Sequence, residues 1–199
     1  MMFHFFRRNP PNHSIASLYG TIVAQARAAP FYRICGVPDT VNGRFEMVVL
    51  HTVLVLRRLE SEPLPVRKIG QALFDRFCGD MDGSLREMGV GDLAVPAKMR
   101  KIGEAFYGRQ AAYGAALATG DAEPLVAALE RNVFGAHTGT QNPTSGLGTI
   151  GAIRLAAYVR AVAAQLASQS GEALSRAELS FPDPEGHLAT DHRPVDAAT

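Results

Sequence analysis

The sequence predicts an all-α protein: a single compact bundle of about seven helices with no sheet. Apolar residues recur at spacings of three and four along most of the chain, which is the period of an amphipathic helix. No stretch shows the convincing alternation of apolar and polar residues that marks a half-buried strand. The chain has 199 residues, 47% of them hydrophobic and 20% charged. That composition is ordinary for one globular domain with its own core.

The first two predicted helices lie in the N-terminal third of the chain. Ser14 is a good N-cap for a helix that runs to about Ala26, and Pro30 prevents it from continuing. Residues 35–43 contain Gly, Pro, Asp and Asn and are expected to form a loop. Residues 45–59 are apolar almost all round, as expected of a helix at the centre of a bundle.

Glycine and proline divide the middle of the chain into shorter predicted helices. Residues 60–65 separate the central helix from the next one, which is expected over residues 66–78. Gly79 is expected to end that helix. A short helix then follows over residues 81–88 and is expected to stop at Gly89.

Three further helices complete the predicted bundle. Residues 97–117 show a long helical pattern after a start signal at residues 92–96, and a helix opened by Asp121 and Pro124 runs to Phe134. Residues 135–148 are rich in Gly, Thr, Asn and Pro and predict a loop. A last long helix is expected over about residues 149–167.

We expect three parts: a flexible leader over residues 1–13, a helical domain over residues 14–168, and an acidic, partly disordered tail over residues 169–199. The leader places its phenylalanines before its arginines, the reverse of a signal peptide, so we expect no targeting signal. The longest apolar run, residues 45–56, is 12 residues long, whereas a membrane span needs about 20. The sequence therefore predicts a soluble chain and leaves peripheral membrane contact open.

Charge is divided along the chain although the net charge is only +1. Residues 1–60 hold seven basic and three acidic side chains, and residues 170–199 hold six acidic and two basic ones. The low net charge argues against a general nucleic-acid binder, and we expect no DNA partner. The basic first part could be a solvated face. Alternatively, it could rest on a ribosome or an anionic membrane surface, which would make the protein a general helical adaptor.

The motifs of common enzyme classes are missing from the sequence. It has no G-x-S-x-G, no Walker lysine and no H-E-x-x-H. Cys35 and Cys78 lack metal-ligand spacing and predict reduced, buried thiols, and His51 lies in an apolar run that predicts a core histidine. His187 and His192 alone are a weak indication of a metal. We therefore expect no enzymatic activity, no cofactor and no metal.

One segment matches the dinucleotide-binding fingerprint G-x-G-x-x-G by letter, at Gly146, Gly148 and Gly151. That fingerprint needs a strand before it, because the pyrophosphate binds where a strand turns into a helix. Here a loop precedes the motif. The favoured interpretation is close helix packing at the glycines, and a nucleotide-binding enzyme remains as the alternative.

The densest group of polar and aromatic side chains lies between residues 80 and 113. Lys98 and Lys101 share a helical face. Residues 107–109 then place a tyrosine ring, a glycine and a guanidinium next to one another. Such groups often anchor interfaces. The same charges could instead form an internal salt-bridged corner between two helices. The candidate partner-binding residues are Leu85, Arg86, Asp92, Lys98, Lys101, Tyr107, Gly108, Arg109 and Tyr113.

Three blocks in this region, LREMGVGD, VPAKMRK and AFYGRQAAY, resemble the ubiquinol–cytochrome c chaperone family, and the resemblance extends over roughly residues 30–170. It implies an all-helical assembly factor for ubiquinol–cytochrome c reductase that grips another protein, newly made cytochrome b, instead of catalysing a reaction. The resemblance places the family signature on Leu85, Arg86, Gly89, Asp92, Pro96, Lys98, Tyr107, Gly108, Arg109 and Tyr113.

The resemblance also implies partners and a location. The partners would be cytochrome b or another respiratory-complex subunit, with a small partner protein or a ribosome as further partners. The chain is short and has no transit sequence, so it is similar to a bacterial relative, expected in the cytoplasm or at the inner face of the inner membrane. The expected mechanism is capture of an apolar or amphipathic segment in a groove between helices, with Arg and Lys on its rim.

Overall fold

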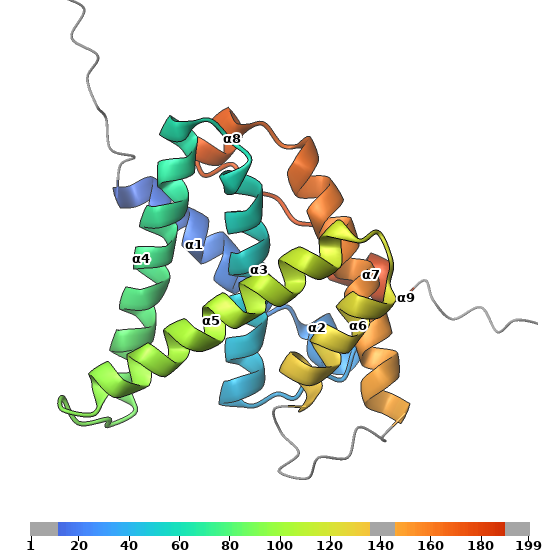
Figure 1. Ribbon diagram of the computed structural model, residues 1–199, viewed down its shortest axis with the longest axis horizontal. Coiled ribbons are helices and arrows are strands. Elements are labelled where there is room, and N and C mark those ends of the chain that lie inside the picture. The colour runs from blue at the N-terminus through green and yellow to red at the C-terminus, as the bar shows by residue number, and fades with distance from the viewer. Residues whose placement is uncertain (1–11, 136–145, 190–199) are drawn as a thin grey trace, which may run out of the picture.

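The computed structural model describes residues 12–135 and 146–189, and the regular structure in these ranges is helical, which confirms the all-α bundle (Figure 1). The elements are α1 (Asn12–Ala26), α2 (Ala29–Arg33), α3 (Val41–Glu60), α4 (Leu64–Glu87), α5 (Val95–Ala118), α6 (Glu123–Leu129), the π-helical turn η1 (Glu130–Phe134), α7 (Gly146–Ser168), α8 (Gly171–Ser175) and α9 (Pro184–Ala189).

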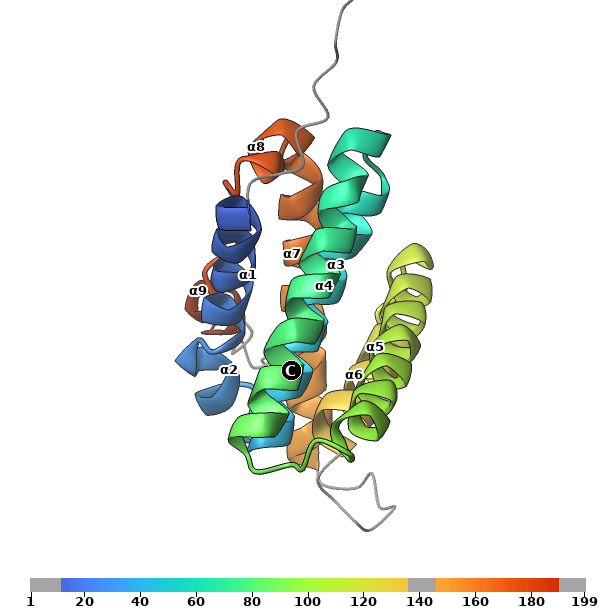
Figure 2. The same ribbon diagram turned by 90° about the vertical axis from the view of Figure 1, so that its left-hand side faces the viewer.

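Helix α3 is the centre of the bundle. It packs against α1, α4, α5 and α7, and Figure 2 shows α1 on one side of it and α5 on the other. Every residue from Glu46 to Leu56 is buried. A helix that is apolar all round is stable in water only when other helices cover all its faces, and this is the arrangement that the composition of residues 45–59 predicts.

The expected break at Gly79 is wrong. Helix α4 runs without interruption from Leu64 to Glu87, and it ends where Gly89 adopts a left-handed backbone conformation with φ +80°. A glycine inside a helix costs about 1 kcal/mol relative to alanine. Burial of the apolar face of α4 outweighs that cost, because Ile69, Leu73 and Phe77 pack in the core before Gly79 and Leu85 is buried after it.

Residues 171–189 are more ordered than the sequence indicates. We placed the end of the helical domain at residue 168, yet Leu174, Leu179 and Leu188 are buried in the same core as the long helices. The helices here have five and six residues, which is too short to show a helical period. The helical domain therefore extends to residue 189 at least. Residues 1–11, 136–145 and 190–199 of the expected leader, loop and tail lie outside the described residues.

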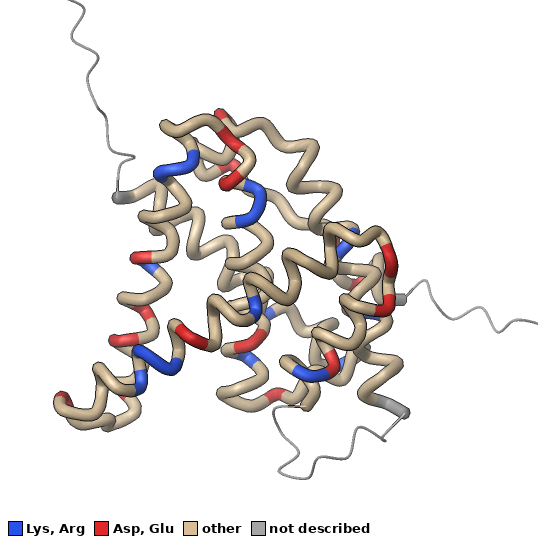
Figure 3. The backbone as a smooth tube through the Cα atoms, viewed as in Figure 1, with Lys and Arg blue, Asp and Glu red and all other residues tan. Residues whose placement is uncertain are grey.

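Several basic residues of the N-terminal part form ion pairs within the chain, and Figure 3 shows where the charged residues lie along the backbone. Arg33 on α2 pairs with Glu185 on α9 at 3.1 Å, which joins the basic beginning of the chain to its acidic end. Arg44 pairs with Asp39 at 2.6 Å. These pairs leave less free positive charge than the sequence count alone indicates.

Arg58 fixes the corner where α7 ends. Its guanidinium donates hydrogen bonds to the carbonyls of Leu166 (2.8 Å) and Gln169 (2.7 Å), and it pairs with Glu62 at 2.5 Å. Carbonyls at a helix C-terminus lack partners within the helix, so a cation here both satisfies them and complements the helix dipole. A Cβ atom at Gly171 would lie 2.1 Å from the Glu62 carboxylate, so a side chain there would require that carboxylate to move.

Within the described residues, one helix is long and apolar enough to cross a membrane by length and composition, the Gly148–Ser168 stretch of α7. In the structure, 44% of the residues in the apolar 18-residue window of this stretch are buried inside the protein. Leu155, Val159 and Val162 of this stretch belong to the common core. Packing in the bundle thus accounts for the apolar residues on the buried side of α7.

His51, which the sequence predicts to be a core residue, is fully buried on α3. Its Nδ1 lies 2.8 Å from the Met47 carbonyl, which can only accept, so Nδ1 carries the proton. The Tyr158 hydroxyl then donates to Nε2 at 3.1 Å and accepts from the Gln25 amide at 2.8 Å. Burial lowers the pKa of His51 to about 4, so the ring is neutral at pH 7.

The buried His51 makes the stability of the protein depend on pH. Below its ordinary pKa of about 6.5 the unfolded chain binds a proton, whereas the folded chain does not bind it until about pH 4. The unfolded state holds more protons in this window, so stability falls as the pH falls through it. We expect this site to cost about 2 kcal/mol of unfolding free energy between pH 7 and pH 5.

Urea denaturation of the parent and of His51→Gln at both pH values measures this contribution. The variant is expected to be less stable at pH 7 and to lose about 2 kcal/mol less than the parent on acidification. All other histidines are shared, so their effects cancel in the comparison. Parallel stability losses in the two proteins would show that His51 does not titrate in this way.

Candidate functional site

The nine predicted partner-binding residues do not form one surface. Tyr113 is completely buried, and Leu85 is nearly so. Burial raises the pKa of the Tyr113 phenol, and the nearby charge of Glu46 adds to that effect. Two further residues of the family signature have roles at helix ends: Gly89 ends α4, and Pro96 lies in the first turn of α5.

Arg109 joins α5 to the central helix. Its Nε and Nη2 groups donate to the two carboxylate oxygens of Glu46 at 2.7 and 2.5 Å, and the Glu46 side chain is only 2% exposed. This two-point geometry suits a guanidinium and a carboxylate. The hydrogen bonds to Glu46 raise the pKa of Arg109, so the guanidinium is charged at neutral pH. The guanidinium of Arg109 is therefore engaged within the fold.

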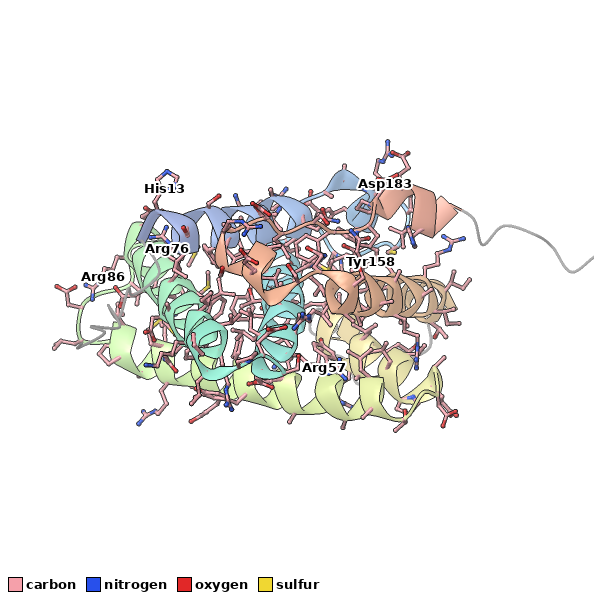
Figure 4. The ribbon with its side chains drawn as sticks, turned by 90° about the horizontal axis from the view of Figure 1, so that it is seen from above. His13, Arg57, Arg76, Arg86, Tyr158 and Asp183 are labelled. Carbon is pink, nitrogen blue, oxygen red and sulfur yellow. The ribbon has the colours of Figure 1, made fainter. Side chains whose placement is uncertain are left out.

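Arg86 holds the turn between α4 and α5, at one end of the molecule (Figure 4). It pairs with Asp82 at 2.7 Å on its own helix and with Asp92 in the turn. Hydrogen bonds to these carboxylates, Asp82 first, raise the pKa of Arg86. Arg86 and Asp92 thus form the internal corner that the sequence left open as the alternative. Both remain solvent-exposed, and a partner contact by them stays a prediction.

Lys98, Lys101, Tyr107 and Gly108 lie exposed on α5. Tyr107 is the most conspicuous of them, because its side chain is 59% exposed while its ring lies against Phe74 at a centroid distance of 5.6 Å. Their role in partner binding stays a prediction.

The G-x-G-x-x-G segment opens α7, and no strand precedes it in the described part of the chain. Its last glycine allows close packing, since a Cβ atom at Gly151 would lie 2.0 Å from the Cys35 carbonyl oxygen and 2.9 Å from the Phe134 ring. Arg154, one turn later, donates to the Ile34 carbonyl at 3.0 Å. The start of α7 is pressed against the loop around Cys35, which supports the packing interpretation of the motif.

An apolar groove of about 630 Å³ lies between α1, the beginning of α3, the end of α4 and the beginning of α5. Two of its apolar residues are strongly exposed, Val41 (71%) and Met88 (56%). Residues from four helices contribute to it, which is why the sequence pattern did not reveal it. The apolar lining consists of Val23, Val41, Phe45, Val48, Met81, Leu85, Met88 and Ile102.

Charged residues surround the groove. Arg44 pairs with Asp39 and lies over the Tyr32 ring at 5.7 Å, and the hydrogen bond from Arg44 lowers the pKa of Asp39. On the other wall, Asp80 accepts a hydrogen bond from the Tyr19 hydroxyl at 3.0 Å. Arg27 and Glu87 complete the charged lining. The groove thus has an apolar floor and walls of both charges.

The groove is suited to binding a chain segment. Methionine side chains are flexible and polarisable, so they adapt to different apolar surfaces, and Met81 and Met88 both lie here. A helix with one apolar face is the usual occupant of a groove of this kind. Among the described residues, no three His, Cys, Asp or Glu side chains are grouped so that they could hold a metal ion.

The comparison with known proteins identifies the family. A family model described as ubiquinol-cytochrome C chaperone matches residues 33–181. The chain belongs to this family. The match begins in α2 and includes α8, which agrees with the packing of residues after 168 against the core.

Two relatives show how far the similarity extends. The crystal structure of the Cbp3 homolog from Brucella abortus superimposes with a TM-score of 0.75 and 39% identity, over 87% of this chain and 91% of that one. The ubiquinol-cytochrome-c reductase complex assembly factor 1 of Xenopus laevis is 26% identical over 117 residues. The aligned region is 59% of this chain and 58% of that relative, less than two thirds of its length.

Gly151 is expected to tolerate no side chain. Gly151→Ala places a methyl group against the Cys35 carbonyl and the Phe134 ring and is expected to destabilise the protein by about 2 kcal/mol or more. Gly103→Ala, in the middle of α5 with open space around it, is the matched control and is expected to stabilise by about 0.5–1 kcal/mol. Chemical denaturation measures both. Equal behaviour of the two variants would refute the close packing.

Substitution of Arg109 is expected to lower the stability of the protein, whatever its effect on partner binding. Arg109→Ala leaves the Glu46 carboxylate buried and unpaired, which costs about 3–5 kcal/mol, whereas replacing both residues by methionine is expected to cost clearly less. Denaturation of Arg109→Met, of Glu46→Met and of the double methionine variant gives the coupling between the two side chains. An Arg109→Ala protein as stable as the parent would contradict the structural role and return Arg109 to the candidates for partner contact.

Proposed function

We propose that this protein is a non-enzymatic assembly chaperone of ubiquinol–cytochrome c reductase that holds an apolar or amphipathic segment of newly made cytochrome b in the groove between α1, α3, α4 and α5. Membership of the chaperone family supports the assembly role. The observation that supports the mode of binding is the apolar groove itself, with Val41 and Met88 exposed on it.

The energetics fit temporary binding. An apolar side chain of the size of leucine or phenylalanine contributes about 1.5–3 kcal/mol when it leaves water completely. Two or three such side chains in the groove offset the cost of association without making release slow. Arg27 and Glu87, both in the lining of the groove, would orient a segment that carries charges of both signs.

We further propose that the protein works in the cytoplasm, at the inner face of a bacterial inner membrane. The proposed client is a membrane subunit, and its segments need protection from water before insertion. The alternative of a general adaptor with a basic N-terminal surface has less support, because Arg33, Arg44 and Arg58 are paired within the fold.

Charged substitutions in the groove are expected to reduce assembly without unfolding the protein. Val41→Asp with Met88→Asp places carboxylates where apolar side chains of the client would lie, and both positions are exposed, so stability is expected to change little. The matched control is Ile150→Asp with Ile153→Asp, two exposed residues on α7 away from the groove.

The amount of assembled reductase in membranes of cells with each variant, measured by native gel and cytochrome b absorbance, is the readout. We expect a loss with the groove variant and a normal level with the control, while thermal unfolding shows both chains folded. A normal level with the groove variant would eliminate this groove as the client site. A normal level after deletion of the gene would eliminate the assembly role as a whole.

A further inference from the structure

A second hollow, separate from the groove, lies between α4 and α5. The two helices meet at their connecting turn and diverge from it, with the C-terminal half of α3 between them (Figure 1). The resulting cleft has a volume of about 480 Å³. Leu56 and Leu59 of α3 and Phe106 of α5 are among the residues that line it.

One wall of the cleft is aromatic and firmly supported. The Phe74 ring of α4 lies 5.0 Å from Phe106 and 5.6 Å from Tyr107, and Phe77 lies 5.1 Å from Phe106. Phe77 and Phe106 are completely buried, whereas Tyr107 is 59% exposed, and Leu64 near the beginning of α4 is 65% exposed. An exposed aromatic ring held against a buried cluster is preorganised, which is typical of residues that dominate binding energy.

The charges around the cleft are predominantly positive. Arg67 and Lys68 line it from α4, and neither has an ion pair with another residue of the ranges 12–135 and 146–189. Glu60 is the one carboxylate among the lining residues, and it already accepts a hydrogen bond from the Gln110 amide at 2.8 Å.

Both helices carry further charged residues. The three lysines of the whole sequence, Lys68, Lys98 and Lys101, all lie on α4 and α5, and Figure 3 shows basic residues near the beginnings of both helices. Arg100 lies on the same helical stripe of α5 as Tyr107, two turns before it.

We propose that this cleft binds an acidic amphipathic helix of a protein partner. The apolar face of that helix would lie on Leu64, Phe74 and Tyr107, and carboxylates three or four residues apart would face Arg67 and Lys68. A flat membrane surface fits less well, because the apolar floor is set back between two helices. The proposal goes beyond the client groove, since it concerns a different surface with a different charge.

The test uses the full chain in its own cells, with a photo-crosslinking amino acid at Leu64 or at Gln71, both on the cleft. Captured peptides are identified by mass spectrometry. We expect a protein segment with a helical pattern and carboxylates three or four residues apart, captured from both positions. Replacing Val41 and Met88 by Asp is expected to leave this capture unchanged, which separates a failure here from a failure of the client groove.

Charge reversal then tests the recognition. Arg67→Glu with Lys68→Glu is expected to reduce the crosslinking yield about tenfold or more, and replacing the carboxylates of the captured segment by Lys is expected to restore it with this variant only. Lys98→Glu with Lys101→Glu, outside the lining, is the matched control and is expected to change the yield less than about twofold. Arg67→Ala with Lys68→Ala is the second variant if charge reversal lowers the melting temperature.

Several outcomes would overturn the proposal. One is capture of a segment without an acidic face, and another is capture of lipid alone or of a second copy of this chain. A yield that neither the Glu nor the Ala variant changes would also overturn it, as would the absence of any captured protein from both positions.

Discussion

Complete burial of the middle of α3, from Glu46 to Leu56, is the constraint on which the rest of the structure depends. Every polar group on a helix without a solvent-facing side needs a partner, since an unpaired one costs about 1–3 kcal/mol and a charged one more. Apart from tyrosines, the buried polar or charged side chains of the described residues are Glu46, His51 and Thr52, and all three lie on α3. Thr52 bonds to the Val48 carbonyl of its own helix at 2.8 Å. The other two reach other helices.

These two contacts determine where the neighbours of α3 lie. Glu46 accepts from Arg109 and so holds α5 at the N-terminal part of α3, while His51 bonds to Tyr158 and so sets the position of α7. Apolar packing alone would allow α5 and α7 to slide along α3, because hydrophobic contacts are not directional. The groove and the cleft both have α5 as a wall, so the Glu46–Arg109 pair also positions the surfaces for which we propose functions.

The sequence predicted the local features well and the features made by several helices poorly. The long helices follow from periodicity that a single segment displays, and His51 follows from its place in an apolar run. The family follows from three dense blocks. The groove could not be found in this way, because Val23, Phe45, Met81 and Ile102 come from four different helices. The cleft was missed for the same reason, although Tyr107 was singled out.

The errors have the same origin. Gly79 indicates a helix end when only nearby residues are considered, but buried side chains on both sides of it decide the outcome. Residues 171–189 have too few apolar positions for a period, but Leu174, Leu179 and Leu188 reach a core that other segments have built. Arg109 has the chemistry of an interface anchor, but a carboxylate 63 residues earlier in the chain already occupies it.

The distinction between paired and unpaired charge separates structural from binding roles on this protein. Arg33, Arg58, Arg86 and Arg109 are each engaged by a carboxylate of the same chain, so a partner would have to break an existing pair to use them. A partner that binds Arg67 and Lys68 breaks no ion pair. These two residues line the same cleft as the exposed ring of Tyr107, which packs against Phe74. The binding free energy contains only what the new contacts contribute beyond the interactions that they replace. Unpaired cations next to preorganised apolar surface are therefore a better guide to an interface than the density of charge in the sequence.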